Sequence, residues 1–213
     1  MKILYYIFLC LIIVIILMIR VPLEFVYFEN KTDYIGYLKK YYNNDDIVGE
    51  LRVGKLNEVL VKSDDNDYYL NHNLYKETDY HGSVFIDYRN DLDDKIVLVY
   101  GHNSMYGDTP FSYLENYYDE YFLNDNNIIT LCGSDFCFNY VIFSVFVETD
   151  DWFYMNIEGD FSNYLDKLMK KSWFDRNIKV VNDDSIVLLQ TCSYHSKYKD
   201  FSKKYLIIAA KRI

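Results

Sequence analysis

The chain has 213 residues, is 51% hydrophobic and carries a formal net charge of −10, with 22 Lys and Arg against 32 Asp and Glu. This length suffices for one substantial core and leaves no room for two ordinary domains. The acidic balance argues against nucleic acid as a partner, because phosphate binding requires clustered Lys and Arg.

The N-terminal residues 3–19 form an uncharged apolar run between Lys2 and Arg20. Seventeen apolar residues are the lower limit for crossing a bilayer core, and residues 20–28 extend the run through the interface. A cleaved signal peptide has a shorter apolar core and a small-residue cleavage site, which this sequence lacks. We therefore predict an uncleaved membrane anchor over residues 1–28, with the following domain exported.

A helix and linker are predicted over residues 29–46. Tyr34, Ile35, Leu38 and Tyr41 recur at helical spacing, and an Asn/Asp cluster follows them. Beyond residue 47 the pattern changes to short apolar runs separated by Asn, Asp and Gly. These runs are 48–53, 57–61, 67–71, 82–88, 95–101, 127–132, 138–147, 178–182, 185–191 and 205–211. Many short strands at this spacing, in a chain with 24 Tyr and 14 Phe, predict an antiparallel barrel or sandwich.

Two segments between the predicted strands have helical patterns. Residues 109–125 begin with Thr109 before Pro110, a cap followed by the residue favoured at the first helical position. Residues 159–175 carry Phe161, Leu165 and Leu168 on one face and Lys on the other. The second segment would be a large connection between late strands, and long connections often carry function.

Cysteine and histidine residues at strand ends are the candidates for chemistry. Cys192 follows the apolar run 185–191, whereas Cys132 and Cys137 either form a disulfide across a hairpin or remain two unpaired thiols. An unpaired thiol in an exported protein is a candidate nucleophile, and it needs a proton acceptor and donor nearby. His102 directly follows the run 95–101, so both residues emerge where a strand ends. A barrel can place two such ends side by side.

Three segments resemble the class B sortases. Residues 82–122, "GSVFIDYRNDLDDKIVLVYGHNSMYGDTPFSYLENYYDEYF", are similar to the family's core signature with its "YGHN" motif. Residues 188–194, "LLQTCSY", resemble its Thr-Cys segment, and residues 64–73, "DDNDYYLNHN", resemble an upstream stretch. The likeness extends from about Gly49 to the C-terminus. Residues 49–53 and 58–61 depart from the family pattern, which makes this chain a divergent member.

The resemblance implies a mainly β fold, an eight-stranded barrel over residues 47–213 with an N-terminal helix, an inserted helix and a membrane anchor. It implies a transpeptidase that attaches surface proteins to the cell wall of Gram-positive bacteria. Cys192 would attack the carbonyl after Thr in an "NPxTx"-like sorting signal, and a peptidoglycan amine would resolve the thioacyl enzyme. His102 would act as general acid and base. No metal or organic cofactor is implied.

The same resemblance assigns a substrate groove. It places Asn66 and Leu70 on one wall, and Thr149, Phe153 and Tyr154 in the loop before the inserted helix. It also places Ser193 in the cleft, after the nucleophile. For Phe153 and Tyr154, plain core packing is an equal alternative.

One position departs from the family in a way that bears on activity. Class B sortases carry on the last strand an Arg that stabilises the oxyanion. Here the candidates are Lys204, Tyr205 and Arg212, and we favour Lys204 because a bulge would bring its ammonium into the cleft. The departure keeps open two other functions, an inactive peptide-binding barrel and a hydrolytic cysteine peptidase.

Overall fold

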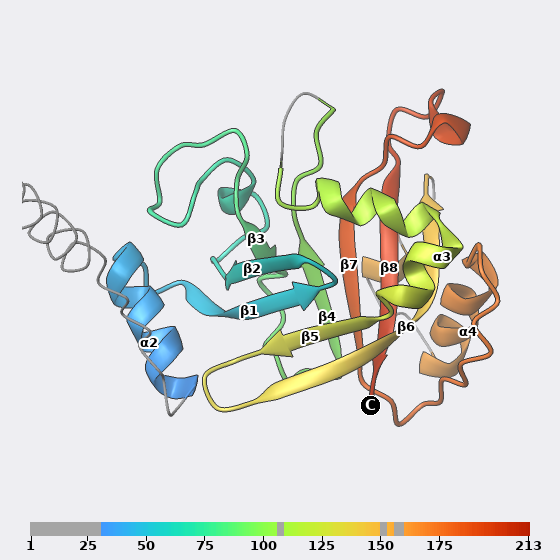
Figure 1. Ribbon diagram of the computed structural model, residues 1–213, viewed down its shortest axis with the longest axis horizontal. Coiled ribbons are helices and arrows are strands. Elements are labelled where there is room, and N and C mark those ends of the chain that lie inside the picture. Colours follow the sequence, from blue (N-terminus) through green and yellow to red (C-terminus); the bar gives the residue numbers. More distant parts are fainter. Residues whose placement is uncertain (1–30, 106–108, 150–152, 156–159) are drawn as a thin grey trace, which may run out of the picture.

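The computed structural model describes residues 31–105, 109–149, 153–155 and 160–213. Within them, eight strands form a closed barrel in the order β1-β2-β3-β4-β7-β8-β6-β5 (Figure 1). The strands are β1 Ile47–Val53, β2 Leu56–Val61, β3 Val84–Ile86, β4 Ile96–Tyr100, β5 Ile128–Cys132, β6 Cys137–Glu148, β7 Ile186–Cys192 and β8 Tyr205–Arg212. The α-helices are α2 Lys31–Tyr42, α3 Glu120–Asp125 and α4 Phe161–Lys171, and the 3-10 helices are η1 Tyr68–Leu70, η2 Ser112–Tyr118, η3 Phe153–Met155 and η4 Ser196–Tyr198. The predicted eight-stranded barrel is confirmed.

The barrel is mixed rather than antiparallel as predicted. β2 pairs with β3 in parallel, and β4 pairs with β7 in parallel, whereas the other neighbours are antiparallel. Parallel neighbours require long crossover connections. The segment between β2 and β3 contains η1, and the chain between β4 and β7 contains the helices and the β5–β6 hairpin. The β4–β7 pair positions the candidate catalytic residues.

The strands are buried on both faces, which explains their nearly continuous apolar runs. All eight strands contribute to an interior cluster that includes Leu51, Val99 and Leu206, and η2 adds Leu114 to it. The alternate residues, such as Leu188 and Ile207, lie in a second cluster with side chains from α2 and α4. In Figure 1, α2 lies beside β1, and α4 lies near β6 at the opposite side of the barrel.

The helix predicted over residues 109–125 is two helices, η2 and α3. Thr109 is not a helix cap, because η2 begins only at Ser112, and Asp119 caps α3 by accepting from the amide of Phe122. The predicted strand 67–71 is wrong, because it contains the 3-10 helix η1, and residues 178–182 belong to none of the strands. Short apolar runs do not distinguish a strand from a buried turn by periodicity alone.

The hairpin cysteines form a disulfide. Cys132 and Cys137 are directly paired across β5 and β6, with their Cα atoms 4.1 Å apart. Cys192 is thereby the free cysteine of the described residues. No helix among those residues is long and apolar enough to cross a membrane, and the predicted anchor over residues 1–28 lies outside them.

Candidate active site

The parallel pairing of β4 with β7 brings His102 and Cys192 together. Tyr100 and Gln190 are register partners at the end of this pair. His102 and Cys192 each follow by two residues, so they take equivalent positions on neighbouring chains about 4.8 Å apart. Residues ninety positions apart in sequence thus meet at one end of the barrel.

Three hydrogen bonds hold the two chain segments together beyond the strands. The amide of Gly101 donates to Gln190 O at 3.3 Å, and Thr191 Oγ1 donates to Gly101 O at 2.8 Å. Asn103 Nδ2 donates to the carbonyl oxygen of Cys192 at 2.9 Å. The segments carrying the imidazole and the thiol are therefore fixed relative to each other.

Gly101 allows this end of the strand to pack closely. A Cβ on residue 101 would lie 2.7 Å from the ring of Phe111, which is completely buried. Any side chain at this position would displace either the ring or the backbone leading to His102. A glycine before the histidine is thus a packing requirement.

The hydrogen bond of His102 defines which ring nitrogen carries a proton. Nε2 lies 2.7 Å from Leu70 O, and a carbonyl oxygen only accepts, so Nε2 is protonated. The ring of Tyr80 is stacked on the other side, with centroids 6.3 Å apart. Nδ1 is then the nitrogen that remains to take up and release a proton.

Cys192 is half-buried, and burial raises the pKa of its thiol. The positive charge of Lys204 lowers the pKa but does not outweigh burial. At neutral pH the sulfur is therefore predominantly a protonated thiol. A base must take its proton when the sulfur attacks a carbonyl.

The pH dependence of thiol alkylation tests this electrostatic environment. A raised pKa favours the neutral thiol, so the rate of Cys192 alkylation by iodoacetamide should reach half its maximum above about pH 8.5, the ordinary thiol value. The rate is measured by peptide mapping between pH 6 and 10, with free cysteine as the reference. Rapid alkylation already complete in its rise by pH 6 would contradict a protonated thiol.

His102 and Cys192 line a cavity of about 300 Å³. Of the other residues predicted for the site, Asn66 and Leu70 lie on its wall. The residues not predicted for it include Phe85, Tyr100, Gly101, Met155, Gln190 and Thr191. Four of these directly precede His102 or Cys192 on β4 and β7, so position next to the strand-end motifs was the available signal.

The remaining groove candidates lie off the described wall of this cavity. Ser193 is buried, and its hydroxyl is 2.7 Å from the hydroxyl of Tyr118. Tyr154 is 1% exposed and belongs to the outer core cluster, which is the packing alternative. Thr149 follows β6, and its amide donates to the Glu148 carboxylate. Phe153 lies in η3, and its side chain is outside the described part of the structure.

The three oxyanion candidates have different positions. Tyr205 lies on the cavity wall and pairs with Cys192 across β7 and β8. The Lys204 ammonium donates to Lys199 O at 3.3 Å and Phe201 O at 3.2 Å. Arg212 stands seven residues beyond Tyr205, about 23 Å along the strand, with its guanidinium over Phe138. Arg212 is therefore too distant to act on the thiol.

Comparisons with known proteins agree with this geometry. No family model matches the chain. It is 34% identical to the sortase B of Listeria monocytogenes over 178 residues, covering 80% of this chain and 71% of that protein. Its fold resembles Clostridium perfringens sortase B, with a TM-score of 0.72, 34% identity, and coverage of 84% of this chain and 98% of that one.

Two further solved structures carry ligands. The Staphylococcus aureus sortase B–substrate complex has a TM-score of 0.76 at 27% identity, covering 87% of each chain. A sortase B complexed with triglycine has a TM-score of 0.77 at 27% identity, covering 88% of each. A closed barrel with a histidine and a cysteine at the ends of adjacent strands thus defines this protein as a sortase-type enzyme. Within that class, the chain belongs to the sortase B family.

Proposed function

We propose that this protein is a cysteine transpeptidase that cleaves a sorting signal after Thr and transfers the acyl group to a peptidoglycan amine. The observation that carries the proposal is the shared cavity of Cys192 and His102 in a chain of the sortase B family. The relatives solved with a substrate and with triglycine support a peptide donor and an amine acceptor. Anchoring by residues 1–28 would hold the domain outside the cell membrane.

The two side chains divide the reaction into acyl transfer to sulfur and acyl transfer to nitrogen. Cys192 Sγ bonds to the carbonyl carbon as its proton moves to Nδ1 of His102. The C–N bond then breaks, and the imidazolium returns that proton to the leaving amine, which leaves a thioester. The incoming amine attacks the thioester carbon and transfers a proton to His102. Finally the C–S bond breaks and the proton returns to the sulfur.

The oxyanion formed in both steps needs a hydrogen-bond donor. The amide of Ser193, next to the nucleophile, donates to Lys204 O at 3.0 Å and is committed to the sheet. The Lys204 ammonium is bound to two carbonyls, whereas Tyr205 lies on the cavity wall. These contacts favour the Tyr205 hydroxyl as the donor over our expectation of Lys204, which would act through its charge.

A pair of variants separates these two residues. Tyr205→Phe should lower kcat about 100-fold, the typical effect of removing one oxyanion donor. Lys204→Ala should lower kcat less than tenfold, since only a screened charge is lost. Steady-state cleavage of the peptide measures both. A larger loss in Lys204→Ala than in Tyr205→Phe would return the role to Lys204.

Product analysis distinguishes the proposed transpeptidase from the two alternatives. Full-length protein in detergent is incubated with an Asn-Pro-X-Thr-X peptide library, with and without triglycine, and the products are identified by mass spectrometry. A transpeptidase gives the triglycine-ligated product, and a hydrolytic peptidase gives only the free acid. Peptide binding without either product would identify a binding barrel.

A further inference from the structure

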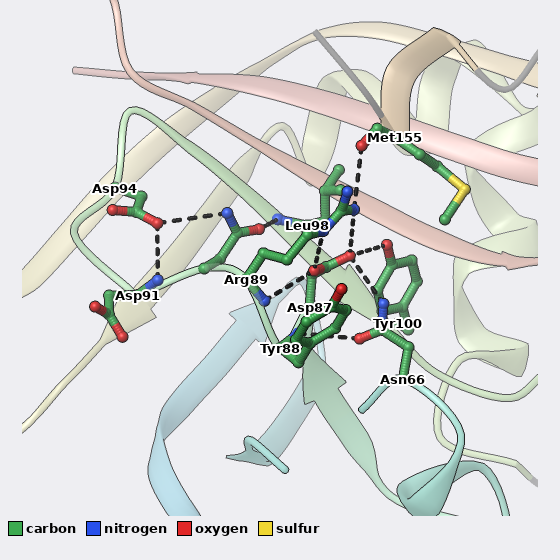
Figure 2. Close-up of polar contacts among 10 residues, drawn as sticks. Asn66, Asp87, Tyr88, Arg89, Asp91, Asp94, Leu98, Tyr100 and Met155 are labelled. Atoms are coloured by element: carbon green, nitrogen blue, oxygen red, sulfur yellow. Dashed lines mark hydrogen bonds and ion pairs between the residues drawn. The ribbon is translucent and has the colours of Figure 1, made fainter. Parts of the chain in front are cut away.

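A buried carboxylate beside the cavity has no part in the chemistry described above. Asp87 directly follows β3, and its side chain is completely buried. Its Oδ1 accepts from the amide of Arg89 at 3.0 Å and from Arg89 Nε at 2.7 Å. Its Oδ2 accepts from Asn66 Nδ2 at 3.0 Å, Tyr100 OH at 2.8 Å and Arg89 Nη2 at 2.8 Å (Figure 2).

The donors to Asp87 connect it to three parts of the cavity wall. Asn66, from the loop before η1, and Tyr100, from the end of β4, both line the cavity. Arg89 Nη2 also donates to Met155 O at 3.1 Å, and Met155 in η3 lines the cavity as well. Figure 2 shows these residues converging on one carboxylate from separate segments. Without this carboxylate, the three wall segments have no shared contact among these hydrogen bonds.

The orientation of Asn66 depends directly on this arrangement. Its Nδ2 donates to Asp87 and its Oδ1 accepts from the amide of Tyr88 at 3.0 Å. Both ends of the amide are thereby fixed, and one N–H of Nδ2 remains for a ligand. A residue expected to contact the substrate is therefore aimed by a residue that does not.

The carboxylate stays ionised at all pH values at which the enzyme would work. Burial would raise the pKa of Asp87, but hydrogen bonds from Arg89, Tyr100 and Asn66 outweigh it and lower the pKa to about 2. An ionised carboxylate accepts all five hydrogen bonds, whereas an amide offers only one oxygen acceptor. The network therefore requires Asp at this position.

We propose that Asp87 is a positioning residue for the peptide groove, which holds Asn66 and Tyr100 directly and Met155 through Arg89. This inference rests on the proposed function, because it assigns these walls to the sorting-signal peptide. Asp87 itself touches neither the thiol nor the imidazole. Its loss should therefore affect peptide binding and leave the intrinsic reactivity of Cys192 unchanged.

Three variants separate the parts of the network. Asp87→Asn keeps the size of the side chain but replaces one acceptor with a donor facing other donors. Arg89→Lys keeps a positive charge near Asp87, but a single ammonium does not reproduce the fork that bonds both Asp87 and Met155. Asp94→Asn is the matched control, since Asp94 accepts from the amide of Asp91 at 2.8 Å in the same loop and lies off the described cavity wall.

The first measurement is hydrogen exchange of the full-length protein, which does not depend on turnover. Asp87→Asn should increase exchange at residues 66–70 and at 153–155, and Arg89→Lys at 153–155 alone, with the β7 and β8 amides unchanged. Asp94→Asn should leave both segments as in the wild type. Equal exchange in wild type and Asp87→Asn, or an increase spread over the whole barrel, would overturn the proposal.

The second measurement compares peptide kinetics with alkylation. Asp87→Asn should raise KM for the Asn-Pro-X-Thr-X peptide about tenfold, with kcat and the rate of Cys192 alkylation changed less than about twofold. A loss in kcat with KM unchanged would refute a positioning role in the groove. A wild type that exchanges as expected but turns over no peptide would instead refute the proposed function alone.

Discussion

Replacing Cys192 by Ala is expected to abolish both cleavage and ligation of a sorting-signal peptide, to below about one thousandth of the wild-type rate. The reason is that the thiol is the atom that would become acylated, and none of the other described cysteines is free. Steady-state cleavage of the peptide, followed by chromatography, measures the loss. Turnover within tenfold of wild type would exclude Cys192 as the nucleophile.

The control for this variant is peptide binding. Cys192 is only half-buried, so removal of its sulfur should leave the barrel folded. Cys192→Ala should therefore bind a fluorescent sorting-signal peptide within about threefold of the wild-type Kd. Loss of binding together with loss of turnover would mean that the variant had damaged the groove, and Cys192→Ser would then replace it in the assay.

Replacing His102 by Gln is expected to lower kcat/KM by about 10²- to 10⁴-fold, the usual contribution of a general acid and base. Glutamine retains an N–H that can donate to Leu70 O, so the hydrogen bond that orients the wild-type ring has a substitute. It does not exchange protons at neutral pH. Cleavage kinetics of the sorting-signal peptide provide the measurement.

Two controls accompany His102→Gln. His81→Gln changes an exposed histidine that pairs with Asp79, and it should retain wild-type kinetics. Alkylation of Cys192 at pH 10 should be equal in His102→Gln and wild type, because both sulfurs are then largely ionised. A His102→Gln enzyme with more than a tenth of wild-type kcat/KM would contradict the assignment of His102 as acid and base.

The location of His102 and Cys192 at strand ends could be read from the sequence because each directly follows a continuous apolar run. The barrel and its eight strands follow from the same runs. The parallel pairing of β4 with β7 could not be inferred from the runs, since it depends on crossovers formed by distant segments. This pairing is nevertheless what brings the two residues together.

The directions of side chains were harder to predict than their positions. Lys204 stands beside Tyr205, yet its ammonium turns to the carbonyls of Lys199 and Phe201, a contact set by the loop after η4. Tyr154 is buried because the outer core has room for its ring. The Asp87 network joins residues 66, 87, 89, 100 and 155, so no local pattern reveals it.

The claim on which the whole account depends is that an acyl group passes through the sulfur of Cys192 beside the imidazole of His102. Intact-mass measurement of the enzyme, quenched in acid during reaction with a sorting-signal peptide in the absence of amine, tests it directly. The account predicts a peptide thioester whose mass includes Thr as its last residue and whose site maps to Cys192. Cleaved peptide with no adduct on the protein, or an adduct on another residue, would contradict it.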